Sequence, residues 1–117
     1  MRFLVVFREN AAVTVQMPMP AVMDMVETTA GYLDDLKKKG KVVDAGYFAA
    51  EHGGCAIFDV DSLAELSALV ESTPVRVFCD VECMPFLTTD EWRPFFAKSK
   101  AEVLAQFEKM AAAAPKP

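Results

Sequence analysis

The sequence predicts one α+β domain in which two helices cover a four-stranded antiparallel sheet. Three observations predict this fold class. The chain has 117 residues, of which 53% are apolar, strand-like and helix-like patterns alternate along it, and two strand-like runs are separated only by a glycine-containing turn. A chain of this length supports one domain and can form a core without metals or disulfides. The apolar fraction excludes a disordered chain.

The first elements are a strand and a long helix. Residues 3–8 (FLVVFR) are rich in β-branched and aromatic side chains, which favours a strand. Residues 10–20 contain two prolines near their end and are expected to be an extended connection. A helix is expected from Ala21, with lysines in its last turn and Gly40 at its stop. Its apolar positions share one helix face: Val22, Met25, Val26, Thr29, Leu33 and Leu36.

A hairpin and a second helix follow. Residues 42–50 and 55–60 are compatible with strands, and the intervening residues 51–54 (EHGG) indicate a hairpin turn. Ser62 is expected to cap a helix over residues 63–71. These elements place a pair of adjacent strands between two helices.

The last strand is predicted over residues 75–85, which completes a β-α-β-β-α-β order typical of ferredoxin-like folds. Residues 1–87 are therefore expected to form the ferredoxin-like domain. Residues 88–112 are expected to add a helix with Pro94 in its first turn, and residues 113–117 a flexible tail. The start of this helix is the most aromatic stretch of the chain, with Trp92, Phe95 and Phe96.

Charge and composition exclude several function classes. The formal net charge is −5, from 17 acidic and 12 basic side chains, which argues against nucleic acid as a partner. No apolar stretch reaches the ~20 residues that a membrane span needs, and the N-terminus does not resemble a signal peptide. The three cysteines match no disulfide framework. We therefore expect a cytoplasmic protein without a membrane partner.

The cysteines and the single histidine also argue against a metal or cofactor. Cys79 and Cys83 lie in the last predicted strand, about 13 Å apart, too far for a disulfide or for one zinc ion. We interpret both as small core residues, and Cys55 as buried too. With one histidine and no glycine-rich nucleotide motif, we expect no metal and no cofactor.

The face of the sheet that the helices leave open is expected to need a partner. Strand alternation would place one set of side chains on this face, opposite the cysteines. Phe78 and Met84 in that set are apolar, so we expect a second copy to cover the face and form a dimeric α/β barrel or a larger homo-oligomer. The set comprises Arg76, Phe78, Asp80, Glu82 and Met84.

Charged residues on this face are candidates for chemistry. Asp80 and Glu82, about 7 Å apart along the strand, are suited to proton transfer if apolar walls surround them. A nearby arginine is suited to hold a substrate carboxylate. Alternatively, these charges face water or pair with neighbours, and His52 is either an exposed turn residue or part of a pocket rim. The candidates are Glu82, Asp80 and His52 for catalysis, and Arg76, Arg8, Tyr47 and Phe78 for substrate binding.

A group of residues in the second half of the chain resembles the muconolactone isomerases: AIFDVDS at 56–62, Glu65-Leu66, Leu69, Pro74, Asp80-Val81-Glu82 and Pro85. The similarity runs without gaps from about Lys41 to Phe86, and the Lys-Gly end of the first helix fits it too. The resemblance implies a ferredoxin-like domain that pairs through its sheet. It also implies an enzyme that needs no cofactor and moves one proton across an unsaturated lactone.

Two hypotheses for function follow. The first is a cofactor-independent, isomerase-like enzyme acting on an unsaturated lactone or a similar carbonyl compound. The second is a non-catalytic oligomeric module that binds a small ligand or only assembles. The second is favoured by Leu4 and Val6, which stand where polar residues project in the isomerases, and by residues 42–47 (VVDAGY), which lack that family's tryptophan and arginine.

Overall fold

The computed structural model describes residues 1–115 and divides the chain into two units, Met1–Phe86 and a second unit from Leu87 onward. The second unit contains α4 (Thr89–Ala113). Part of the predicted flexible tail, residues 116–117, lies outside the described residues. The first unit contains β1 (Arg2–Glu9), α1 (Ala11–Thr14), α2 (Met19–Lys38), β2 (Val42–Tyr47), β3 (Gly53–Asp59), α3 (Leu63–Glu71), the 3-10 helix η1 (Pro74–Val77) and β4 (Cys79–Pro85).

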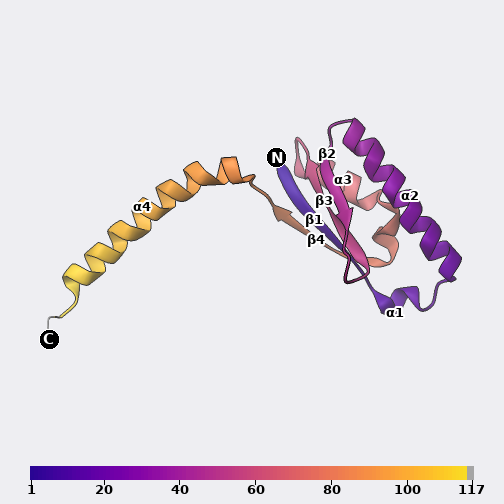
Figure 1. Ribbon diagram of the computed structural model, residues 1–117, viewed down its shortest axis with the longest axis horizontal. Coiled ribbons are helices and arrows are strands. Elements are labelled where there is room, and N and C mark those ends of the chain that lie inside the picture. Colours follow the sequence, from indigo (N-terminus) through magenta and orange to yellow (C-terminus); the bar gives the residue numbers. More distant parts are fainter. Residues whose placement is uncertain (116–117) are drawn as a thin grey trace. The chain divides into compact units, whose positions relative to one another are not determined.

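The sheet of the first unit is four-stranded and antiparallel, in the order β2-β3-β1-β4 (Figure 1). In its central register, Val5 of β1 lies opposite Ala56 of β3 on one side and Cys83 of β4 on the other. The predicted α+β class and βαββαβ order are confirmed. The pairing of two copies into a barrel stays a prediction.

The core lies between one face of the sheet and the two helices α2 and α3 (Figure 1). At its centre the side chains of Val5 and Phe58 are 0% exposed. Each buried side chain of this size contributes roughly 1.5–3 kcal/mol through removal of apolar surface from water. Helix residues that pack on these strands include Val22, Leu36, Leu66 and Val70. The core thus uses the apolar periodicity that predicted α2 and α3.

The connection between β1 and α2 differs from the prediction, because residues 10–20 are not extended throughout. Asn10 caps the short helix α1, and its Oδ1 accepts a hydrogen bond from the Ala12 amide at 3.1 Å. α2 begins at Met19, two residues before the predicted start, with Pro20 in its first turn. A proline is tolerated there, because first-turn amides have no intrahelical acceptor.

The hairpin turn also lies earlier than predicted, since β3 begins at Gly53. The Phe48 amide donates to the Gly53 carbonyl at 2.9 Å, so residues 48–52 form the turn. At Gly54, a Cβ atom would lie 2.4 Å from the Gly46 carbonyl oxygen. The two glycines after His52 therefore permit close approach of neighbouring strands instead of turning the chain.

The predicted last strand is wrong in its first part, because Pro74–Val77 forms a 3-10 helix and β4 begins at Cys79. Proline at the start presets the dihedral angle of a helical turn. Strand alternation therefore does not apply to Arg76 and Phe78. Phe78 is 3% exposed and belongs to the core, so its predicted place on the open face of the sheet is wrong.

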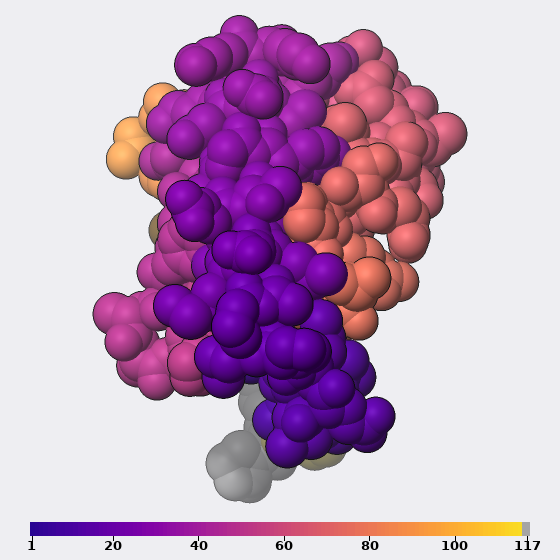
Figure 2. All heavy atoms as spheres, turned by 90° about the vertical axis from the view of Figure 1, so that its right-hand side faces the viewer, coloured from indigo at the N-terminus to yellow at the C-terminus, as the bar shows by residue number. Residues whose placement is uncertain are grey.

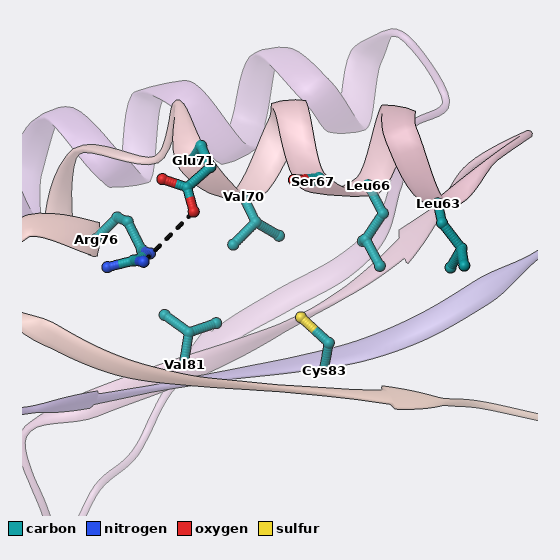
Figure 3. A pocket seen from close by; sticks show the side chains of 8 residues that line it. All are labelled: Leu63, Leu66, Ser67, Val70, Glu71, Arg76, Val81 and Cys83. Carbon is teal, nitrogen blue, oxygen red and sulfur yellow. Dashed lines mark hydrogen bonds and ion pairs between the residues drawn. The ribbon is translucent and has the colours of Figure 1, made fainter.

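The three cysteines have different environments. Cys79 is buried, as predicted, whereas Cys55 is half-buried and Cys83 is exposed. The interpretations of Cys83 as a core residue and of Cys55 as a buried one are therefore wrong. Cys83 nevertheless points toward α3, as does Val81 (Figure 3). Cys55 lies opposite Val6 of β1, on the face of the sheet away from the helices.

The second unit is one helix with exposed apolar side chains. Thr88 and Glu91 form a capping box at its start, and the rings of Trp92 and Phe96 stack with centroids 4.6 Å apart. Pro94 is the sixth residue of α4, beyond the predicted first turn. No residue of α4 is buried. Neither α4 nor any other helix in residues 1–115 is long and apolar enough to span a membrane.

Candidate functional site

A pocket of about 730 Å³ lies between α2 and one end of the sheet. Figure 2 shows the molecule from the helix side, where α2 (dark purple) lies with the β2–β3 hairpin on one side and α3 on the other. Gly46, Gly53 and Gly54 of the β2–β3 hairpin are among the residues that line the pocket. Much of the wall is apolar: Phe7, Val22, Met23, Val26, Leu33 and Phe78.

A carboxylate and an imidazole meet at this pocket. Glu9, the last residue of β1, places its Oε2 atom 3.6 Å from Nδ1 of His52 in the hairpin turn. The Glu9 amide also donates to the His52 carbonyl oxygen at 3.1 Å, which ties the turn to β1. The Glu9 side chain is 22% exposed and that of His52 is 91% exposed. A carboxylate beside an imidazole is a pair of groups suited to general acid–base chemistry.

Two weak acids, Tyr47 and Cys79, also line the pocket. The Tyr47 hydroxyl donates to the Val26 carbonyl oxygen of α2 at 3.3 Å. Burial raises the pKa of Tyr47, and the charge of Asp34 adds to this effect. Burial also raises the pKa of Cys79, to about 11, with further contributions from the charges of Glu9 and Asp80. Both side chains are therefore protonated, and able to donate hydrogen bonds, near neutral pH.

The pocket is separate from the predicted carboxylate pair. Arg8 lies opposite Asp80 in the β1–β4 register and 3.5 Å from Glu82, measured from Nη1 to Oε2. Nε of Arg8 lies 3.4 Å from Oε1 of Glu51. Neither Asp80 nor Glu82 lines the pocket. Because residues alternate along β1, Arg8 and its partners in β4 lie on the face of the sheet away from Phe7, Glu9 and the helices.

Arg76 lies at a third location, beside a smaller pocket of about 300 Å³ between α3 and β4 (Figure 3). Its Nη2 atom lies 3.4 Å from Oε1 of Glu71 at the end of α3. Leu66 and Val70 of α3 point toward Val81 and Cys83 of β4. The smaller pocket therefore has apolar walls and one ion pair, and no other predicted site residue lines it.

The structure thus separates the seven predicted site residues into three groups: His52, Tyr47 and Phe78 at the large pocket, Arg8, Asp80 and Glu82 on the open face, and Arg76 beside α3. The sequence interpretation missed Glu9. Alternation along β1 places Glu9 on the same face as Phe3, Val5 and Phe7, and a carboxylate on a core face is a signal that was available. No group of three or more potential metal ligands occurs within residues 1–115.

Two solved structures share the fold of this chain. A crystal structure of muconolactone isomerase superimposes with a TM-score of 0.64 at 18% identity, covering 75% of this chain and 90% of that one. A 5-chloro-2-hydroxyhydroquinone dehydrochlorinase (TftG) from Burkholderia phenoliruptrix, in complex with 2,5-dihydroxybenzoquinone, gives a TM-score of 0.60 at 17% identity. The overlap is 77% of this chain and 97% of the dehydrochlorinase. At such identities the likeness shows the shared fold.

No curated protein matches the sequence. A family model does match, and it spans residues 1–90, which include the whole sheet, α2, α3 and every residue of the large pocket. Its description is muconolactone delta-isomerase. The family model thus extends the resemblance, which the sequence indicated from about Lys41 to Phe86, to residues 1–90. The chain belongs to the muconolactone delta-isomerase family.

Proposed function

We propose that this protein is a cofactor-independent, isomerase-like enzyme that shifts a proton in an unsaturated lactone or a similar cyclic carbonyl compound. The observation that carries the proposal is the Glu9–His52 pair, 3.6 Å apart, at a pocket of about 730 Å³ with mostly apolar walls. Volumes of this order are usual for small-molecule sites. Family membership and the two similar structures, one named for a lactone and one holding a quinone, support a cyclic carbonyl substrate.

In the proposed step, His52 accepts a proton from a carbon next to the substrate carbonyl. The electron pair of the broken C–H bond moves toward the carbonyl oxygen and gives an enolate. The protonated imidazole then returns the proton to another carbon of the same system, so the step consumes no oxidant or reductant. Glu9 stabilises the imidazolium through its charge. The Tyr47 hydroxyl exchanges its 3.3 Å hydrogen bond to the Val26 carbonyl oxygen for one to the enolate oxygen.

Steady-state assays of His52→Gln on unsaturated lactones test this assignment. We expect kcat to fall by about 10²–10⁴, the usual contribution of a general acid–base group. Glu82→Gln is the matched control, because Glu82 pairs with Arg8 and does not line the pocket. If Glu82→Gln loses activity and His52→Gln retains it, the reaction occurs on the open face of the sheet, as the sequence suggested.

A binding module without catalysis is the second candidate function. It is favoured by the exposure of the His52 side chain, which at 91% is largely solvated in the free chain. In this case ligands occupy the apolar pocket and leave unchanged. Calorimetric binding of a lactone, combined with no turnover of it by the unmodified protein, would support this candidate over the enzyme.

We also propose that two copies pair through the open face of the sheet. In the first unit both α2 and α3 lie on the other face (Figure 1), while Leu4 and Ile57 are only half-buried and Met84 is 41% exposed. Ile57→Lys would place a charge in this interface and is expected to yield monomers in light scattering. Leu63→Lys, an exposed position of α3, is the control. A monomeric unmodified protein would contradict the pairing.

A further inference from the structure

The helix α4 carries an apolar face that the proposed reaction does not use. Because each residue turns the helix by about 100°, apolar side chains that recur every three, four or seven residues share one side of it. We call this set the α4 stripe, and it comprises Trp92, Phe96, Val103, Phe107 and Met110. Each of these side chains is between 43% and 68% exposed, so the stripe of a single copy faces water.

The stripe lies outside the part of the chain that the family shares. The family model ends at residue 90, in the first turn of α4, whereas the stripe begins at Trp92. An exposed apolar face of this length marks a surface that another protein surface covers.

The size of the stripe fits an interface between two copies of the same helix. An aromatic side chain has about 150–250 Å² of surface. Covering the half-exposed rings of the stripe together with Val103, Met110 and the neighbouring Phe95 would remove on the order of 500 Å² per helix. A pair of helices would bury roughly 1,000 Å² in total, which is the lower limit for a specific interface.

The charges beside the stripe are complementary between two copies. α4 contains four acidic and four basic side chains and is neutral, although the whole chain carries a net charge of −5. One flank of the stripe carries, in order along the helix, Glu91, Lys98, Glu102 and Lys109. In an antiparallel, two-fold symmetric pair this flank meets the same flank of the second helix. When the helices overlap fully, Lys98 comes close to Glu102 of the second copy. Glu91 likewise comes close to Lys109 of the second copy.

A parallel pair lacks this match. Its helices would bring opposite flanks together, and the charged residues of the other flank, Arg93 and Lys100, are both basic. The two helix dipoles would also point the same way, which is unfavourable for neighbouring helices. Charge order and dipole therefore favour the antiparallel arrangement.

We propose that α4 pairs with α4 of a second copy of this chain, antiparallel and centred near Ala101, with the two stripes packed against each other. In this arrangement Trp92 lies near Met110 of the second copy. Ser99 lies near Val103 of the second copy. The pairing uses only residues of the second unit, so it is separate from pairing through the sheet. Because its area is small, it dissociates in dilute solution and forms at high protein concentration or between copies that are already assembled.

Disulfide cross-linking of the full chain tests this pairing. Two proteins are prepared in a background with Cys55→Ser and Cys83→Ser, one with Ser99→Cys and the other with Val103→Cys, and the buried Cys79 is kept. They are unfolded together, refolded, oxidised at high concentration and analysed by mass. Antiparallel pairing puts position 99 beside position 103 of the second copy, whereas two positions 99 are displaced by about 6 Å along the axis. We expect the mixed dimer in at least about tenfold excess over either symmetrical dimer, because a disulfide tolerates little displacement.

An excess of symmetrical dimers, a random mixture of the three dimers, or no cross-linked dimer would each overturn the proposed pairing. Oligomers in light scattering without the mixed dimer would leave the sheet pairing intact and remove the α4 pair. A mixed dimer from a protein that is monomeric in dilute solution would leave the α4 pair intact and remove the sheet pairing.

Charge reversals in both proteins of the mixture test the register. Lys98→Glu replaces two attractive contacts of the pair with repulsive ones and is expected to lower the yield of mixed dimer about fivefold. Adding Glu102→Lys to this variant should restore the yield. Lys100→Glu is the matched control, because position 100 on the other flank lies close to position 100 of the second copy and stays a like-charge contact. An equal loss from Lys98→Glu and Lys100→Glu, or no recovery in the double variant, would contradict the antiparallel register.

Discussion

Replacing Glu9 with glutamine should lower the pKa of Cys79. In the unmodified protein burial, Glu9 and Asp80, in decreasing order, raise this pKa to about 11. At pH 8 only about one Cys79 side chain in a thousand is then a thiolate, and the alkylation rate should rise about tenfold per pH unit below the midpoint. Because burial contributes at least as much as Glu9, the variant should retain more than half of the elevation.

The assay is the pH dependence of Cys79 alkylation by iodoacetamide, followed by mass spectrometry in a background with Cys55→Ser and Cys83→Ser. Glu27→Gln is the matched control, because Glu27 lines the same pocket but is not among the charges that raise the Cys79 pKa. Two results would refute this reasoning: an alkylation midpoint at the ordinary thiol pKa in the unmodified protein, or the same midpoint in Glu9→Gln as in the unmodified protein.

Further predictions concern stability and the helices. Cys79→Ala should reduce the loss of stability at alkaline pH in urea unfolding. The protonated thiol favours the folded state below its ordinary pKa of 9.0, and this contribution, on the order of 3 kcal/mol, is lost as the pH rises through about 11. Phe58→Ala, at a side chain 0% exposed, should cost about 3–5 kcal/mol in the same assay. Gly54→Val should also destabilise the protein, because the new Cβ would lie 2.4 Å from the Gly46 oxygen. Pro94→Ala should increase helicity in circular dichroism, because proline inside α4 removes one backbone hydrogen bond.

Each of these predictions has an opposing outcome. A Cys79→Ala variant that loses stability with pH as steeply as the unmodified protein would show that the thiol is not the titrating group. A Phe58→Ala protein of unchanged stability would contradict the burial of Phe58 in the core. A Gly54→Val protein of unchanged stability would contradict the close approach of β3 to β2. An unchanged circular dichroism spectrum for Pro94→Ala would show that the hydrogen bond missing at Pro94 does not limit helix formation in α4.

Local sequence patterns were sufficient for the main helices and the order of the strands. α2 and α3 follow apolar positions spaced for one helix face, and Ser62 caps α3 through its hydroxyl, which accepts from the Glu65 amide at 3.1 Å. The prediction of a strand was wrong at residues 75–77, because the alternating valines there are equally compatible with a strand and with a 3-10 turn. The 3-10 turn forms because Pro74 starts it and because Val75 and Phe78 pack in the core.

The sequence by itself determined an acidic α+β domain with one histidine, a hairpin near that histidine, and a last strand with Asp80 and Glu82 on one face. Only the tertiary structure decided which charges share a site. Glu9 meets His52 because β1 and β3 are antiparallel neighbours, and this pairing brings the end of one strand to the start of the other. Asp80 and Glu82 lie on the opposite face, as strand alternation predicted, and the β1–β4 register places Arg8 beside them. The charge of each side chain can be read from the sequence. Which charged side chains come within contact distance depends on where each strand begins and on which strand it pairs with.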